Sequence, residues 1–228
     1  VIDIESIGSF LKKNNKRVIF VVDACQSIGQ VEIDVKKQHC DILVASGRKY
    51  LRGPRGTGLL YINKKIKKEI SPLILDIKNT SVKGNRISMD KKSSLFEVFE
   101  YSPALKLGLS KAISDVNKIG IEKIKKKIKN LSSFFLSEMR HFKKFIFYEN
   151  PDFNVGINTF SIKGFKSSEI HDFLLKKKIL TSISNKQTST EYFKKKNINE
   201  VLRVSFHYYN NLDEIKHLKK CLIDLILK

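Results

Sequence analysis

Residues 18–62 decide the fold, and they read VIFVVDACQSIGQVEIDVKKQHCDILVASGRKYLRGPRGTGLLYI. The segment opens with five consecutive apolar residues, 18–22, which end at Asp23. A continuous run of β-branched and aromatic residues is typical of a strand buried on both faces, as in a parallel sheet covered by helices. Further strands are predicted at 42–45 and 58–62. The segment therefore predicts an α/β layer architecture.

The rest of the chain adds helices and a second group of strands. Ile4, Ile7 and Leu11 have helical spacing and predict a helix before the first strand. Later helices are predicted at 104–117, at 121–142, from 167 or 168 to 178, and after the Asn211 cap with Glu214 in a capping box. Strands are predicted at 155–162 and 202–206, and residues 179–183 form a short apolar segment. The change of pattern predicts a boundary near residue 120. A sheet-rich part, 1–120, would precede a smaller α+β part, 121–228.

The composition is strongly basic. The 228 residues include 44 Lys and Arg against 23 Asp and Glu, which gives a net charge of +21. The Lys clusters recur along the whole chain instead of gathering with aromatic residues in one stripe, which argues against a nucleic-acid-binding face. A non-catalytic basic protein that binds nucleic acid or acidic surfaces stays as the alternative function.

The sequence argues against a membrane-spanning or secreted protein, and against a disulfide framework or a metal site. No apolar run approaches the roughly 20 residues of a membrane helix, and the start has neither Met nor a signal-peptide pattern. The three cysteines, Cys25, Cys40 and Cys221, show no spacing typical of a disulfide framework or a metal site. We expect a cytoplasmic protein with reduced thiols and no metal site. We also expect a chain that opens mid-sequence, either processed or a fragment.

Reactive side chains follow the first two strands. Asp23 closes one strand, and the sequence Ser46-Gly47-Arg48-Lys49 closes the next. Ligands of open α/β sheets bind beyond the carboxyl ends of the strands, so an acid and a lysine here form either a salt bridge or a site. The glycine-dense stretch 53–58 favours a site, because glycines let the backbone pass close to a bulky ligand.

Arginine is scarce in this chain, which makes its positions informative. There are seven Arg and 37 Lys, yet Arg48, Arg52 and Arg55 fall within eight residues. The planar guanidinium suits phosphate and carboxylate groups better than Lys does. These three residues and the isolated Arg203 are therefore candidate anion contacts.

Two stretches carry a family resemblance. Residues 22–62 contain Asp-x-x-Gln, an Asp some eighteen residues later, Ser-x-x-Lys and a Gly-Pro-x-Gly-x-Gly loop, and residues 202–218 read LRVSFHYYNNLDEIKHL. They resemble the cofactor-lysine and Arg-x-Ser-x-x-x-Tyr-Asn segments of class V aminotransferases and cysteine desulfurases, which are fold type I pyridoxal-phosphate enzymes. The resemblance implies that 1–120 is the C-terminal part of a cofactor-binding large domain, a mostly parallel sheet with helices. It implies that 121–228 is the small C-terminal domain.

The resemblance also implies a cofactor, pyridoxal 5'-phosphate, and a role for each matching residue. Lys49 would form the internal aldimine and then act as acid and base at the substrate Cα. Asp23 would pair with the ring nitrogen and keep it protonated. Gln26 would donate a hydrogen bond to the phenolic oxygen. Ser46 would contact the phosphate, with help from Arg48.

The substrate implied by the resemblance is an amino acid, whose α-carboxylate Arg203 would bind through two parallel bonds. The family also implies a homodimer. Aminotransferase or C–S lyase chemistry ranks first and epimerisation next. Desulfuration ranks last, because these desulfurases carry a nucleophilic Cys in the loop before this arginine, and residues 183–201 contain none.

Two further departures from the family pattern concern the phosphate. Phe99 and Glu100 stand where many members have the Gly-Thr pair that reaches the neighbouring subunit's phosphate. The upstream phosphate-binding turn and ring-stacking aromatic of the family have no counterpart among these residues. We therefore expect the 228 residues alone to bind the cofactor weakly and the complete parent chain to bind it well.

Overall fold

The structure is a computed structural model that describes residues 2–15, 17–89, 93–149, 155–188 and 190–227. It divides into two compact units, Asp3–Ile119 and Gly120–Lys228, the latter grouped with Val1–Ile2. Within the described residues, no helix combines the length and apolar character that crossing a bilayer requires.

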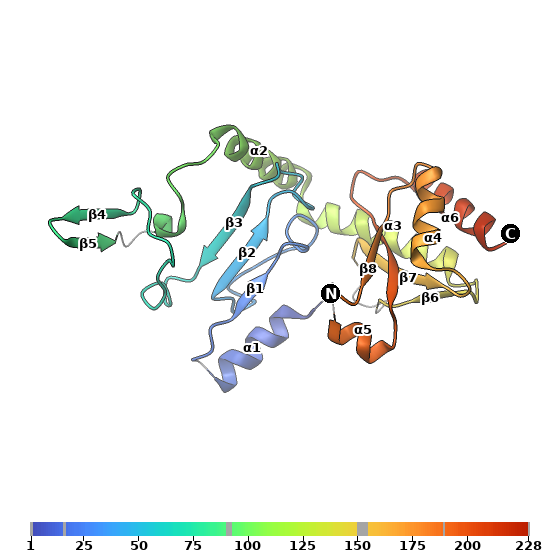
Figure 1. The fold of residues 1–228 in the computed structure, drawn as a ribbon, viewed down its shortest axis with the longest axis horizontal. Helices are drawn as coiled ribbons and strands as arrows, with labels where there is room; N and C mark the ends of the chain where they lie inside the picture. The colour runs from blue at the N-terminus through green and yellow to red at the C-terminus, as the bar shows by residue number, and fades with distance from the viewer. Residues whose placement is uncertain (1, 16, 90–92, 150–154, 189, 228) are drawn as a thin grey trace. The chain divides into compact units, whose positions relative to one another are not determined.

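The Asp3–Ile119 unit contains a three-stranded sheet, a hairpin and two helices (Figure 1). Its elements are α1 (Ile4–Asn14), β1 (Val21–Asp23), β2 (Ile42–Ser46), β3 (Gly58–Ile62), β4 (Thr80–Lys83), β5 (Arg86–Met89), the 3-10 helix η1 (Ser93–Phe96) and α2 (Pro103–Ile119). The sheet has the order β1-β2-β3. Helix α1 and the three predicted strands are thus present, with bounds that differ by a few residues.

The sheet is mixed, which corrects the expectation of a mostly parallel one for the described part of this unit. Strands β1 and β2 are parallel, whereas β2 and β3 are antiparallel. Residues 24–41 are long enough for the crossover that parallel pairing needs. The loop 47–57 instead turns the chain back, so β3 runs against β2.

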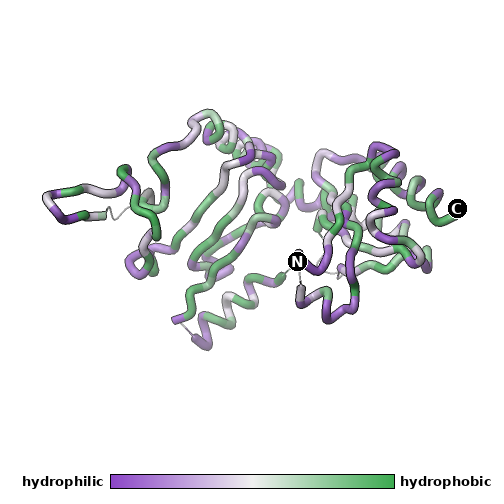
Figure 2. Tube along the Cα trace, in the orientation of Figure 1, coloured by the Kyte–Doolittle hydropathy of each residue, from purple (hydrophilic) through white to green (hydrophobic). Residues whose placement is uncertain are grey.

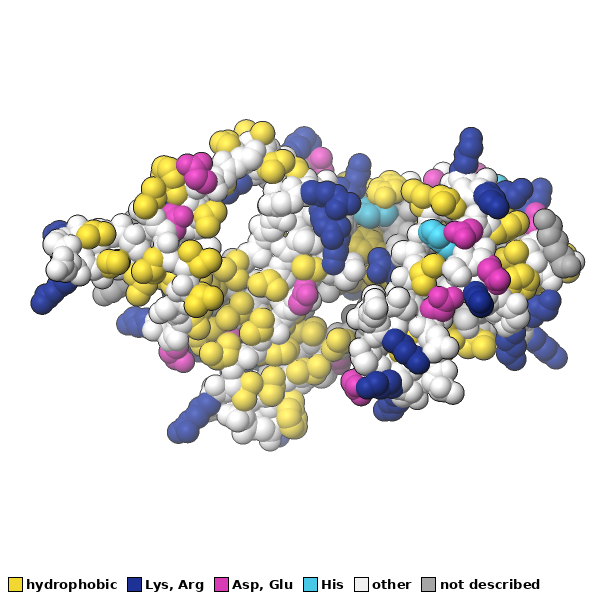
Figure 3. Space-filling view, viewed as in Figure 1, with side chains coloured by type: hydrophobic (Ala, Val, Ile, Leu, Met, Phe, Trp, Pro, Cys, Tyr) yellow, Lys and Arg dark blue, Asp and Glu magenta, His cyan; other side chains and the backbone are white. Residues whose placement is uncertain are grey.

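Strand β1 is shorter than predicted, and it is not buried on both faces. The backbone N–H of Phe20 donates to the Asp41 carboxylate (3.0 Å), and the strand begins only at the next residue. Val22 is buried, whereas Val21 is 54% exposed. Figure 3 shows hydrophobic side chains gathered over this sheet. The apolar run correctly predicted a strand, but the prediction that both of its faces are buried is wrong.

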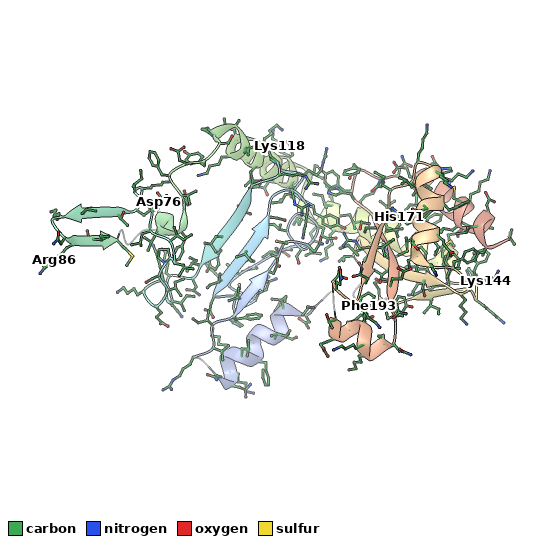
Figure 4. All side chains as sticks on the ribbon, in the orientation of Figure 1. Asp76, Arg86, Lys118, Lys144, His171 and Phe193 are labelled. Carbon is green, nitrogen blue, oxygen red and sulfur yellow. The ribbon has the colours of Figure 1, made fainter. Side chains whose placement is uncertain are left out.

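The hairpin β4–β5 was not predicted from the sequence. Its strands are joined at Lys83 and Arg86 through a turn in which Gly84 has a φ of +56°. Val82 and Ile87 pair across it and are 67% and 61% exposed. Arg86, at its tip, and Asp76, near its base, are labelled in Figure 4. The alternation of Ser, Lys and single apolar residues gives too short a pattern to separate this hairpin from a loop.

The Gly120–Lys228 unit packs helices against an antiparallel sheet. Its elements are α3 (Ile121–Met139), β6 (Phe145–Phe147), β7 (Ile157–Ile162), α4 (Ser167–Lys176), β8 (Ser182–Asn185), α5 (Thr190–Lys196), β9 (Glu200–Ser205) and α6 (Leu212–Ile226). The strand order is β6-β7-β9-β8, with every pair antiparallel. The predicted elements are present, and β6, α5 and the strand β8, which begins within the short apolar segment 179–183, are additional ones.

The core of this unit is apolar and rich in phenylalanine. Phe135 of α3 is fully buried and contacts Phe160 of β7 and Phe206, with ring centroids 5.8 and 5.5 Å apart. Figure 2 shows hydrophobic and hydrophilic residues alternating along the helices, as expected for helices with one buried face. The predicted cap of α6 is confirmed: the Asn211 side chain accepts the Glu214 N–H (3.0 Å), and Glu214 accepts the Asn211 N–H (2.9 Å).

Candidate active site

The parallel pairing of β1 and β2 places two strand ends at one edge of the sheet. Asp23 is paired with Val44, and Ser46 is the last residue of β2. The N–H of Ala24 donates to the Val44 carbonyl (2.8 Å), which extends the pairing past the end of β1. Paired residues share a face and side chains alternate along a strand, so Asp23, Val44 and Ser46 project from the same face.

Asp23 presents a charged carboxylate at this edge. Its Oδ1 accepts the backbone N–H of Cys25 (2.8 Å). The Cys25 thiol, and then this amide, lower the pKa of Asp23; slight burial opposes them, and the positive charge of Lys49 adds a smaller lowering. The carboxylate is therefore ionised at neutral pH, and Lys49 lies close enough to act on it. The structure thus brings together the acid and the lysine that follow the two strands.

Lys49 is half-buried in a loop closed by backbone hydrogen bonds. The Gly47 N–H donates to Thr57 O (2.8 Å), the Gly53 N–H to Gly47 O (2.7 Å), and the Arg52 N–H to Lys49 O (2.9 Å). A side chain at Gly47 would clash with the Thr57 hydroxyl and approach Leu109 Cδ1 to 2.7 Å. The loop is therefore fixed on both sides of the lysine by close backbone packing.

Ser46 offers a polar atom that the protein leaves unused. Its Oγ is buried and has no hydrogen-bond partner among the residues that the structure describes. A buried hydroxyl without a partner is costly, so it points to a ligand that supplies one. Ser46 also lines a cavity of about 1590 Å³, together with Cys25, Thr57 and Lys106. The Ser46 hydroxyl, the Asp23 carboxylate and the Lys49 amine together fit a cofactor that carries a phosphate group and a basic ring.

The cavity does not enclose the whole site. Asp23 and Lys49 do not line it, whereas Ser46 and Cys25 do. The carboxylate of Asp23 is exposed, and Lys49 is half-buried. The described residues thus form one wall of a site around these side chains. The reactive groups of the site, the Asp23 carboxylate and the Lys49 amine, therefore lie outside the lining of this cavity.

The other predicted site residues of this unit lie nearby in sequence and in the fold. Gln26 is half-buried in the turn that follows Asp23, and its carbonyl accepts the side-chain amide of Gln30. Arg48 is exposed, beside Lys49. Arg52 is also exposed, with a φ of +60°, which is uncommon for a residue with a side chain.

Arg203 belongs to the other unit. It lies on β9, paired with Thr159 of β7 and Ser182 of β8. Its Nε donates to the Ser205 hydroxyl (3.2 Å), and the side chain is half-buried. The hydrogen bond from Nε to Ser205 therefore fixes the Arg203 guanidinium on β9, an inner strand of this sheet.

The contact of Cys25 with Asp23 was not predicted from the sequence. The signal was present in the spacing. An Asp side chain commonly accepts the N–H two residues further on, and Cys25 stands at that position after Asp23. Among the described residues, no group of three or more His, Cys, Asp or Glu could hold a metal.

The sequence and the fold of this chain are similar to those of known proteins. The family model described as "Aminotransferase class-V" matches residues 1–218, which include both strand ends, the lysine loop and β9. The chain belongs to the aminotransferase class-V family. This match confirms the family resemblance carried by residues 22–62 and 202–218.

Class V relatives named as cysteine desulfurases align along the chain. The "Probable cysteine desulfurase" of Pyrococcus abyssi is 31% identical over 232 residues, which cover 98% of this chain and 56% of that protein. The protein of the same name from Borreliella burgdorferi is 29% identical, over 98% of this chain and 55% of its own. The chain thus spans about half the length of the curated relatives it matches.

Solved structures confirm the mixed α/β fold. The apo cysteine desulfurase of Thermococcus onnurineus superposes with a TM-score of 0.91 at 26% identity, over 98% of this chain and 56% of that one. A C-DES mutant with glycine covalently linked to its PLP cofactor has a TM-score of 0.85 at 20% identity, over 98% and 57%. At that identity the second similarity concerns the fold alone.

Proposed function

We propose that the protein containing these residues is a pyridoxal-phosphate enzyme that acts on an amino acid, of the aminotransferase or C–S lyase type. The observation that carries this proposal is the pair at the ends of β1 and β2: an ionised Asp23 within the electrostatic reach of Lys49. Membership of the class V family supports it.

The residues at this edge fit the cofactor one by one. Lys49 would hold it through Nζ, and the Asp23 carboxylate would bind the ring nitrogen and keep a proton on it. The unpartnered Oγ of Ser46 would donate to the phosphate, with the exposed Arg48 adding positive charge. Gln26 would donate to the phenolic oxygen. When bound, the cofactor supplies an electron sink for the bonds of the substrate Cα.

The remaining chemistry belongs to the side chains. Lys49 Nζ would carry the proton to and from the substrate Cα. Arg203 would bind the substrate α-carboxylate through its terminal nitrogens, because its Nε already donates to Ser205. Within the family we rank epimerisation after aminotransfer and C–S lysis, and desulfuration last, because residues 183–201 contain no Cys. Several relatives do carry the name cysteine desulfurase, and the ranking stays a prediction.

We further propose that Asp3–Ile119 is the C-terminal part of a larger cofactor-binding domain and Gly120–Lys228 the small domain. A cytoplasmic homodimer is the assembly we expect. The exposed apolar side chains of the hairpin region, Leu73, Ile74, Ile77, Val82 and Ile87, support a further protein surface against this unit. Such a concentration of exposed apolar residues is unusual on a monomer surface.

The test is borohydride reduction of the complete protein with bound pyridoxal phosphate, followed by peptide mapping. We expect the reduced label on Lys49, and we expect Lys49→Ala to lose both the label and turnover. Lys64→Ala, an exposed lysine beyond β3, is the control and should keep both. Label on another lysine, or none, would refute the proposal. A basic binding protein would instead lose only one of 44 positive charges, and its binding would weaken steeply with salt.

A further inference from the structure

The ladder between β6 and β7 changes where β6 ends. Phe147 is paired with Phe160, which makes Tyr148 and Thr159 the next pair. The Tyr148 N–H donates to the Thr159 carbonyl (3.2 Å), as in an antiparallel ladder, where such pairs exchange two hydrogen bonds. The Thr159 N–H, however, donates to Oε1 of Glu149 (2.6 Å) instead of completing the pair. A side-chain carboxyl oxygen thus takes the place of a backbone carbonyl at this position.

The same carboxyl oxygen also binds the side chain of Thr159. The Thr159 hydroxyl donates to Glu149 Oε1, so one atom accepts both the backbone N–H and the hydroxyl of this residue. The Tyr148 carbonyl is left to accept the hydroxyl of Tyr192, which belongs to α5 (3.2 Å). Glu149 therefore fixes both the main chain and the side-chain rotamer of Thr159.

Thr159 stands directly opposite the candidate substrate-binding arginine. It is paired with Arg203 across β7 and β9, the two inner strands of the sheet (Figure 1). Partners in such a pair project from the same face, with Cβ atoms about 4.5–5.5 Å apart. The next pair, Phe160 and Leu202, is fully buried and points to the opposite face. Thr159 is thus the β7 neighbour of the Arg203 side chain, on the face of the sheet turned away from the phenylalanine core.

We propose that Glu149 is a positioning residue for Arg203: by fixing Thr159 it holds the arginine's cross-strand neighbour in one conformation and so keeps the terminal guanidinium nitrogens aimed at the substrate α-carboxylate. This inference rests on the proposed function, in which Arg203 binds that carboxylate. A guanidinium makes two parallel bonds to a carboxylate only when its plane is correctly oriented, and neighbours with locked rotamers supply that orientation. Loosening Thr159 should therefore weaken carboxylate binding and leave the amine end of the substrate unaffected.

Two small amines separate carboxylate binding from the other contacts. Glycine carries an α-carboxylate and no side chain, whereas methylamine lacks the carboxylate. Each exchanges its amine for that of Lys49 on the cofactor, and the cofactor absorbance of the complete protein gives the dissociation constant. We expect Glu149→Ala to raise the dissociation constant of glycine about two- to tenfold, the effect of one net hydrogen bond, and to leave that of methylamine unchanged. Glu149→Gln keeps the Oε1 acceptor and should bind glycine nearly as the wild type does.

A second readout needs no cofactor. Nitrogen-15 NMR of the cofactor-free complete protein follows hydrogen exchange at Arg203 Nε, with Arg203→Lys to assign the signal. We expect faster exchange in Glu149→Ala than in the wild type, because the guanidinium has lost a fixed neighbour. Tyr192→Phe is the matched control: it removes the adjacent hydrogen bond to the Tyr148 carbonyl and leaves Thr159 held. It should change neither readout.

If Glu149→Ala does not fold, Thr159→Val replaces it in both measurements, because valine keeps the β-branched shape and lacks the donating hydroxyl. Glycine binding and Arg203 exchange equal to the wild type would overturn the inference. Equal weakening of glycine and methylamine, or an equal effect of Tyr192→Phe, would also overturn it, since either result indicates a general disturbance of the unit. An Arg203→Ala protein that binds glycine as tightly as the wild type would instead overturn the role of Arg203 in the proposed function.

Discussion

Replacing Gly47 with Ala tests whether the lysine loop is held by close packing. Gly47 has no positive φ, so an alanine there meets no backbone strain. The new Cβ would instead clash with the Thr57 hydroxyl and lie 2.7 Å from Leu109 Cδ1. Overpacking of this kind costs about 1–3 kcal/mol, against a gain of about 0.4–1 kcal/mol from the less flexible unfolded chain. We expect a net loss of about 1–2 kcal/mol in the free energy of unfolding.

The source of that loss can be isolated with Thr57→Ala. This change removes the clashing hydroxyl and also its hydrogen bond to Pro54 O (2.7 Å), which is worth about 1 kcal/mol. The double variant Gly47→Ala/Thr57→Ala should therefore be more stable than the sum of the two single effects predicts, because the alanine has lost its nearest obstacle. The Cβ of residue 57 remains 3.3 Å from the new Cβ, and the flexible Leu109 tip can shift.

The assay is urea unfolding of the wild type, both single variants and the double variant. Gly84→Ala is the control, since its φ is +56° and no atom lies within 4 Å of the new Cβ. It should lose about 1–2 kcal/mol from backbone strain alone, with no rescue by Thr57→Ala. A Gly47→Ala protein as stable as the wild type, or strictly additive effects of Gly47→Ala and Thr57→Ala, would refute the packing argument.

Two further predictions concern the other unit. Burial raises the pKa of Glu149 despite its hydrogen bonds from Thr159, so the folded state binds this proton more tightly than the unfolded state does. The free energy of unfolding should then fall as pH rises from the ordinary value of 4.5 through the raised one, and Glu149→Gln should lack that fall. Urea midpoints from about pH 4 to about pH 7 measure it, and a constant difference between the two proteins would contradict it. Asn211→Ala should cost about 1 kcal/mol by removing the cap of α6, and Asn211→Asp should restore most of it, as thermal unfolding can show.

The sequence by itself determined the features that depend on neighbouring residues. The capping box at Asn211 and Glu214 joins residues three apart, and the apolar run before Asp23 gave a strand. The motifs in residues 22–62 and 202–218 indicated the family, which the match over residues 1–218 confirms. These signals are short-range, so they are readable without knowing what packs against them.

Only the tertiary structure decided which groups meet across the chain. It set β3 antiparallel to β2, exposed one face of β1, and formed the hairpin β4–β5 that no clear periodicity marked. It also left the Ser46 hydroxyl buried without a hydrogen-bond partner among the described residues. Each of these depends on burial and on hydrogen bonds to groups brought in by other segments, and the identity of a residue does not specify which segment will lie beside it.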